Sequence, residues 1–194
     1  MVVCKKLCVF VSGSGTNLQA MLDANIEPAE IVLVFSNNPE AYALERARSR
    51  NIPVEVISHK GYGTREEFEE DIIRTIQPYG IDLIALAGFM RILSPRFVRH
   101  YKNKILNVHP ALLPAFPGMH AARQALEYGV KFTGCTVHFV DEGVDTGPII
   151  QQSVVPVNED DTEDSLQERI QKEEYRIYPE AVKLVAEGKV KIPE

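Results

Sequence analysis

Four mainly apolar runs divide the first part of the chain. They lie at 7–11, 31–35, 81–87 and 105–108, and the first three end directly in Gly or Ser; Asp82 and Asn107 are the polar residues within them. Largely apolar runs of this kind are typical of strands buried on both faces of a sheet. Helical spacing lies between them, as at Phe68, Ile72 and Ile76, where Thr64 and Glu67 form a capping box. Strands alternating with helices predict an α/β fold with a mostly parallel sheet and helices on both faces.

The pattern changes in the second half of the chain. Residues 132–140 alternate, with Cys135, Val137 and Phe139 on one face, and 148–157 follow as a second strand antiparallel to the first. Residues 162–188 then predict a long C-terminal helix with a kink or break near Pro179. We find no repeat or linker, so we expect one domain over residues 1–194.

Composition narrows the class of protein. The formal net charge of −6 favours solubility and gives no general attraction for nucleic acid. The apolar run near the N-terminus is too short for a membrane span or a signal peptide. The three cysteines, Cys4, Cys8 and Cys135, form no Cys-x-x-Cys pair, which argues against a metal site or redox motif. We therefore expect a cytoplasmic protein with free thiols and no bound metal.

The first candidate site is the loop that follows the first strand. Its residues are Gly13, Ser14, Gly15, Thr16 and Asn17, directly after Ser12. Glycines allow close backbone approach, and the N–H groups at a helix start attract anions, so the loop suits a phosphate. We expect a side chain at Gly15 to occupy the phosphate position. A third glycine is missing, which favours a mononucleotide-sized ester over a dinucleotide. A tight turn with a helix cap is the alternative.

Two charged residues stand where their type is unexpected. Arg65 lies in the first turn of a helix, where a cation opposes the helix dipole, so an external anion would explain it. The alternative is a solvated arginine balanced by neighbouring glutamates. Glu174 falls on the apolar stripe of the last helix and predicts an inward carboxylate that needs a polar partner. The alternative is a glutamate at the rim of the core.

Asn107 and His109 are the strongest candidates for chemistry. They are two apart on one strand, so both side chains leave the same face near its C-terminal end, where α/β sheets bind ligands. An amide and an imidazole side by side can stabilise an oxyanion and move a proton. Asp145 lies in a glycine-rich turn and could orient the histidine and raise its pKa, or serve only the turn.

Read together, these segments resemble the glycinamide ribonucleotide formyltransferase family. The resemblance spans nearly the whole chain in order, and its motifs are long and mutually consistent. They are SGSGTNLQ at 12–19, LAGFMRILS at 86–94, NVHPALLP at 107–114, GCTVHFV at 134–140 and DTGPII at 145–150. It implies a single Rossmann-like formyltransferase domain.

The resemblance also implies roles. Asn107, His109 and Asp145 would be catalytic, and the loop Gly13 to Asn17, with Arg65 and Glu174, would hold the ribonucleotide. The residues implied at the folate site are Leu86, Met90, Arg91, Ile92, Leu93, Val98, Asn107, His138, Val140, Asp141, Glu142, Gly143 and Val144. Two departures are Ala111, where many members have Ser, and Ala122, where some have His; His120 could substitute there.

The implied reaction moves the formyl group of 10-formyltetrahydrofolate to the amine of glycinamide ribonucleotide in purine synthesis. Its partners would be small molecules, with no nucleic acid and no membrane, in a monomer or homodimer. The alternatives are formyltetrahydrofolate hydrolase, another formyltransferase such as the methionyl-tRNA enzyme, and a ligand-sensing module without turnover. The isomer of the bond before Pro114 stays open.

Overall fold

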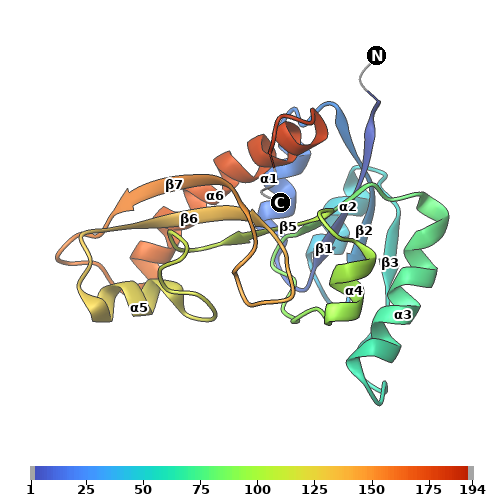
Figure 1. Ribbon diagram of the computed structural model, residues 1–194, viewed down its shortest axis with the longest axis horizontal. Coiled ribbons are helices and arrows are strands. Elements are labelled where there is room, and N and C mark those ends of the chain that lie inside the picture. Colours follow the sequence, from blue (N-terminus) through green and yellow to red (C-terminus); the bar gives the residue numbers. More distant parts are fainter. Residues whose placement is uncertain (1–2, 192–194) are drawn as a thin grey trace.

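The computed structural model describes residues 3–191 and contains one seven-stranded sheet (Figure 1). The strand order is β3-β2-β1-β4-β5-β6-β7. Pairing is parallel from β3 to β5 and antiparallel at β5/β6 and β6/β7. The strands are β1 (Lys5–Val11), β2 (Ala29–Ser36), β3 (Val54–Val56), β4 (Leu83–Leu86), β5 (Ile105–His109), β6 (Phe132–Phe139) and β7 (Ile149–Pro156).

The apolar runs account for the parallel strands. Residues 7–11 of β1 and all of β4 are buried, as expected for strands covered on both faces. The predicted mostly parallel sheet and its antiparallel strand pair are confirmed. The sequence prediction did not include β3, a three-residue strand at the sheet edge.

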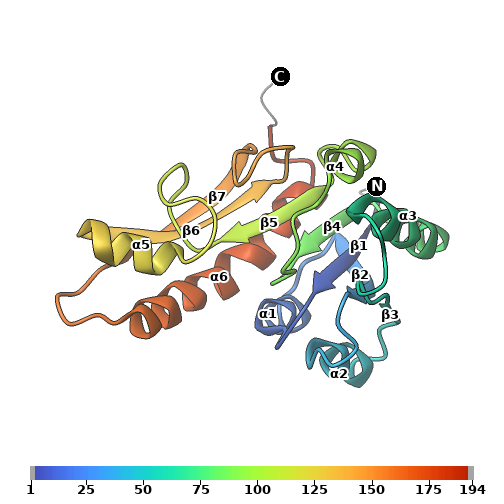
Figure 2. The same cartoon turned by 90° about the horizontal axis from the view of Figure 1, so that it is seen from below.

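Helices cover both faces of the sheet, as predicted (Figure 2). Most of the buried residues of α1, α2, α5 and α6 belong to one apolar cluster, and most of those of α3 and α4 belong to another. No helix among residues 3–191 is both long and apolar enough to cross a membrane. The helices are α1 (Thr16–Asp23), α2 (Ala43–Ser49), α3 (Arg65–Ile76) with a 3-10 turn at Gln77–Tyr79, α4 (Pro95–His100), α5 (Ala121–Tyr128) and α6 (Glu163–Ala186).

Helix boundaries follow local signals in two cases and depart from them in a third. The Thr64–Glu67 capping box at the start of α3 is confirmed. Ser94 caps α4, with Pro95 in its first turn. The sequence predicts a kink or break near Pro179, and the break is wrong, because α6 runs through Pro179 to Ala186. Pro179 is buried beside Tyr178, so packing against the sheet holds the helix together where a backbone hydrogen bond is lost.

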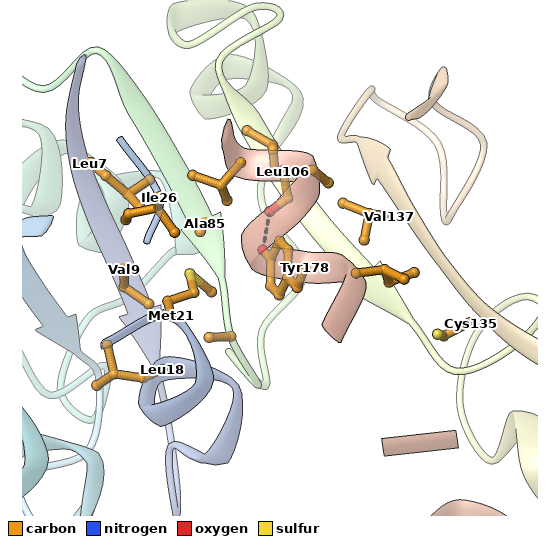
Figure 3. Close-up of a cluster of buried hydrophobic side chains, with 14 of the residues drawn as sticks. Leu7, Val9, Leu18, Met21, Ile26, Ala85, Leu106, Cys135, Val137 and Tyr178 are labelled. Atoms are coloured by element: carbon orange, nitrogen blue, oxygen red, sulfur yellow. Dashed lines mark hydrogen bonds between the residues drawn. The ribbon is translucent and has the colours of Figure 1, made fainter. Parts of the chain in front are cut away.

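The larger apolar cluster ties α6 to the middle of the sheet (Figure 3). Tyr178 is fully buried, and its hydroxyl lies 3.0 Å from the carbonyl oxygens of both Leu86 in β4 and Leu106 in β5. Leu86 is the last residue of β4, and Leu106 is the second residue of the neighbouring strand β5. Tyr178 therefore fixes the spacing of β4 and β5 next to Asn107.

Candidate functional site

Two cavities lie side by side beyond the C-terminal ends of the parallel strands. The loop cavity, about 320 Å³, is lined by residues 12–17, Gly88, Met90, Val108, Pro110 and Glu174, among others. The inner cavity, about 140 Å³, is lined by residues of the loop after β4, of β5 and β6, and of the loop before β7. Open α/β sheets bind ligands at this edge, where the strand order reverses between β1 and β4.

The fold brings the three predicted catalytic residues together. Nδ1 of His109 lies 3.2 Å from Oδ2 of Asp145, and Asn107 pairs in register with His138 across β5 and β6. Nε2 of His138 lies 3.3 Å from Asn107 Nδ2 and 3.6 Å from Asp145 Oδ1. The Asp145 carboxylate thus faces two imidazole rings. The family resemblance implies His138 at the folate, but its position between Asn107 and Asp145 was not predicted.

Asp145 takes a backbone conformation that few residue types adopt. Its φ is 55°, in the left-handed region that Asp and Asn tolerate better than most residues. The Gly118 N–H donates to its Oδ2 at 2.8 Å. Burial works to raise the pKa of Asp145, but the nearby His138 ring, the hydrogen bond from Gly118 and the charge of His109 together hold that pKa below its usual value. Asp145 is therefore kept as a carboxylate.

His109 is buried, and both of its ring nitrogens face acceptors. Nδ1 faces Asp145, and Nε2 lies 2.8 Å from the carbonyl oxygen of Phe116, a residue with φ of 54°. Burial lowers the pKa of His109 and outweighs Asp145 and the Phe116 carbonyl, which act to raise it; His138 lowers it further. Asp145 thus acts on the His109 pKa in the expected direction, but burial outweighs its contribution.

The glycines of the first loop have different roles. Gly15 has φ of 71°, and a Cβ there would lie 2.5 Å from the Cβ of Ala43 in α2. The expectation that a side chain at Gly15 would occupy the phosphate position is wrong, since it would strike α2. A Cβ at Gly13 would meet nothing within 4 Å. Gly13 lines the loop cavity, so its lack of a side chain leaves open space there.

Glu174 faces inward, as predicted from its place on the apolar stripe of α6. It is 5% exposed, which excludes a position at the rim of the core. Asn17 Nδ2 donates to its Oε2 at 3.0 Å. Burial raises the pKa of Glu174, while the bond from Asn17 lowers it. Asn17 Oδ1 is buried and has no hydrogen-bond partner among residues 3–191, so the loop cavity carries an unused acceptor beside a buried carboxyl group.

Arg65 does not line the loop cavity. Its Nη1 donates to the carbonyl oxygen of Ile92 at 3.4 Å, and Ile92 lines the inner cavity. The buried Nε of Arg65 has no partner in the described part of the chain. Arg65 lines neither cavity and contacts the backbone of a segment that lines the inner one, so its role toward the ribonucleotide stays a prediction.

Most of the residues implied at the folate site line the inner cavity. Three do not: Met90 lines the loop cavity, Val98 is buried in the core, and Glu142 pairs with Arg99 at 2.8 Å. Phe89 lines the inner cavity and was not predicted. The implied residues found there are Leu86, Arg91, Ile92, Leu93, Asn107, His138, Val140, Asp141, Gly143 and Val144.

The departures from the family pattern fall on structural positions. Ala111 is fully buried, and its carbonyl accepts a hydrogen bond from Thr136. Ala122 is buried inside α5. His120 does not line the loop cavity, and its Nδ1 lies 3.6 Å from Glu163 Oε1. The bond before Pro114 is cis. Among residues 3–191, no three His, Cys, Asp or Glu side chains cluster as metal ligands.

Comparisons with known proteins agree with this geometry. A family model described as "Formyl transferase" matches residues 5–182. The phosphoribosylglycinamide formyltransferase of Escherichia coli (strain K12) is 44% identical over 97% of this chain and 90% of that protein. The glycinamide ribonucleotide transformylase 1 structure from Symbiobacterium toebii is 49% identical, with a TM-score of 0.94 over 97% of this chain and 91% of that one.

Longer relatives contain the same unit. The trifunctional purine biosynthetic protein adenosine-3 of Drosophila melanogaster is 49% identical over 95% of this chain. The chain spans only 14% of the length of that protein and 19% of its human counterpart.

Proposed function

Because this chain belongs to the formyl transferase family, as its match over residues 5–182 shows, we propose that it transfers a formyl group from 10-formyltetrahydrofolate to the amine of glycinamide ribonucleotide, a step of purine synthesis. Relatives named for this ribonucleotide, at 40 to 44% identity and nearly full length, support the choice of substrate. We further propose that residues 1–194 form one domain that acts on small molecules in the cytoplasm, as a monomer or homodimer.

One observation carries the proposal: Asn107 and Asp145 line the inner cavity, and the loop cavity is lined by Val108 and Pro110, the two sequence neighbours of His109. A group held in one cavity therefore comes close to a group held in the other. Transfer of an acyl group from one substrate to the other needs this arrangement. Holding both substrates close together and correctly oriented removes most of the entropic cost of bringing them together.

The loop cavity suits the ribonucleotide. The Thr16–Asp23 helix begins there, and its free N–H groups favour a phosphate. Gly13 leaves space for close approach. The buried pair of Asn17 and Glu174, with the unused Asn17 Oδ1, can bind a hydroxyl or amine of the substrate. We assign Gly13 to Asn17 and Glu174 to this substrate.

The inner cavity suits the folate. Leu86, Phe89, Ile92 and Leu93 form an apolar wall, and Asp141 and Asn107 add polar groups. The buried Nε of Arg91 has no hydrogen-bond partner within residues 3–191, so a donor is left for a polar ligand atom. When bound, the co-substrate supplies the formyl group.

The catalytic roles follow from the geometry of the side chains. Asn107 Nδ2 would donate a hydrogen bond to the formyl oxygen as negative charge develops there. His109, in its protonated form, would stabilise the same charge. The Asp145 carboxylate would accept a charge-assisted hydrogen bond from His109 Nδ1 and so fix the orientation of the ring. Nε2 of His109 must leave the Phe116 carbonyl to reach a substrate atom.

A transfer assay tests the proposal directly. Purified protein is mixed with 10-formyltetrahydrofolate, with and without glycinamide ribonucleotide, and both tetrahydrofolate and formylated ribonucleotide are measured. We expect product in equal amounts and only when the ribonucleotide is present. Tetrahydrofolate released together with formate, at a rate independent of ribonucleotide, would identify a hydrolase. No turnover with intact binding of both ligands would identify a sensing module.

A further inference from the structure

The segment from Met90 to Ile92 contributes to both cavities, and two of its three side chains are largely exposed, while Arg91 lies over the Phe68 ring at 5.5 Å. Met90 is 79% exposed and Ile92 is 68% exposed. A segment that buries little apolar surface depends on its hydrogen bonds for a fixed position. Two such bonds reach it: the Met90 N–H donates to Ser12 Oγ at 2.9 Å, and the Ile92 carbonyl accepts from Arg65.

The Ser12 hydroxyl can accept from Met90 because its own proton points elsewhere. Ser12 Oγ donates to Asn37 Oδ1 at 2.6 Å. A hydroxyl has one proton and two lone pairs, so donation to Asn37 leaves a lone pair to face the Met90 N–H. The backbone of Ser12 is held separately, by Gly88 at 3.1 Å and by Asn38 Nδ2 at 3.1 Å.

Asn37 is in turn fixed from its other side. It follows β2 and is 6% exposed. Its Nδ2 lies 3.3 Å from His59 Nδ1, and the His59 ring packs edge-on against Phe68 of α3. Because Oδ1 accepts from Ser12, the amide orientation is set, and Nδ2 faces His59. Asn37 itself lines neither the loop cavity nor the inner cavity.

We propose that Asn37 is a positioning residue for the folate co-substrate: through the Ser12 hydroxyl it holds the Met90 N–H, and with it the Met90–Ile92 segment. This inference rests on the proposed function. We call the hydrogen-bonded series Asn37, Ser12 and Met90 the relay. Ser12 and Met90 line the loop cavity, but the ribonucleotide loop has other supports, so the relay should act mainly on the inner cavity, which Arg91 and Ile92 line. The Gly13 carbonyl accepts from the Ala43 N–H at 3.1 Å, and the Ser14 carbonyl accepts from Arg46 Nε at 2.8 Å.

The test compares Asn37→Ala with Asn37→Asp, which keeps the oxygen that accepts from Ser12. Calorimetry measures the affinity of each variant for a 5-deazafolate analogue and, separately, for glycinamide ribonucleotide. We expect Asn37→Ala to bind the analogue about 10-fold more weakly, the effect of one lost hydrogen bond, and Asn37→Asp about 3-fold more weakly. Ribonucleotide affinity should change less than about 2-fold in both.

A second readout reports on the relay itself. Hydrogen exchange of the Met90 amide should become faster in Asn37→Ala. The matched control is Glu40→Gln, since Glu40 lines the same neighbouring cavity as Asn37 and its side chain makes no hydrogen bond within the described residues. This control should leave both affinities and the exchange rate unchanged.

The outcomes separate the inference from the proposed function. Analogue binding that is unchanged in Asn37→Ala, equal losses for both ligands, or an unchanged Met90 exchange rate would each overturn the relay. If Asn37→Ala does not fold, Ser12→Ala is the alternative, because it removes the hydroxyl that accepts from the Met90 N–H. It should weaken binding of the analogue to the same extent. Failure of the wild-type protein to bind the analogue or transfer formyl groups would instead refute the proposed function.

Discussion

Nδ1 of His109 lies 3.2 Å from Oδ2 of Asp145, and both side chains are largely buried. At this separation the carboxylate favours the protonated ring, while burial disfavours it more strongly. The balance between these two effects sets the pH range in which His109 can act.

Replacing Asp145 with Asn should shift that balance further toward the neutral His109 ring. Asp145→Asn removes the contribution that raises the pKa of His109, so this pKa should fall, and the alkaline limb of the rate profile should move to lower pH. The rate at neutral pH should fall about 100-fold. NMR titration of His109 measures the shift, with exposed His120 as an internal reference. The fold should persist, because Asn tolerates φ of 55°. An unchanged His109 pKa would exclude the coupling.

Asn107 should matter for the rate more than for binding. Asn107→Ala should lower kcat about 100-fold to 1000-fold, as the loss of an oxyanion donor does in other acyl transfers. Asn107→Asp keeps the shape of the side chain but replaces the donor with an acceptor, so it should be similarly slow. Steady-state kinetics at saturating concentrations of both substrates gives kcat. A near wild-type kcat in Asn107→Asp would assign the oxyanion to another donor.

The Glu174 side chain should lower the free energy of unfolding at neutral pH. Burial raises its pKa in the folded state, so its stabilising effect is complete below its unfolded pKa and is lost as the pH rises through the folded value. Glu174→Gln should therefore raise Tm at pH 7 by about 3 °C, corresponding to roughly 1 kcal/mol, with little change at pH 4. It should also weaken ribonucleotide binding. Calorimetric melts at both pH values, with Glu168→Gln on the same helix as control, test this. A lower Tm at pH 7 would contradict it.

Gly13 and Gly15 should respond differently to the same substitution. Gly15→Ala should destabilise the protein by about 1–3 kcal/mol, because φ is 71° and the added Cβ strikes Ala43. Gly13→Ala should leave stability unchanged, since its Cβ meets no protein atom within 4 Å. It should weaken ribonucleotide binding, because the added Cβ takes up open space. Urea melts and calorimetry separate the two effects. Equal loss of stability in both would mean that the loop is only a tight turn.

Arg65→Ala should weaken binding of the folate analogue and leave binding of the ribonucleotide nearly unchanged. The reason is its bond to the Ile92 carbonyl, which supports the inner cavity. We expect a loss of about 3-fold to 10-fold in analogue affinity. Arg74→Ala, on the same helix and with a 76% exposed side chain, is the control. A loss confined to ribonucleotide affinity would instead support a contact between Arg65 and the ribonucleotide phosphate.

The sheet could be predicted because its strands carry the signal themselves. The runs at 7–11 and 105–108 are apolar at every position or nearly so, as burial on both faces requires. Short elements escaped detection: β3 has three residues, and α4 has six. The Ser94–Pro95 pair is a cap signal that could have located α4. A single proline did not end α6, because tertiary packing outweighed local preference.

The site was predictable in its residue types and less so in its contacts. Asn107 and His109 share a strand, so their common face follows from periodicity alone. Which segment Arg65 contacts depends on how α3 packs, and no local pattern encodes that. The contact of His109 with Phe116 depends on an irregular loop, and the net pKa of His109 depends on burial by distant segments. These are properties of the assembled molecule.

The position of Tyr178 has a consequence for the order in which the protein becomes active during translation. Every strand that carries Asn107, His109 and His138 is synthesised before the helix whose tyrosine joins Leu86 to Leu106. A ribosome-bound chain that has released residues only through 160 therefore holds all of the catalytic side chains without the clamp that spaces β4 and β5, and without the carboxyl group of Glu174. We expect such nascent chains to remain inactive until α6 emerges and docks.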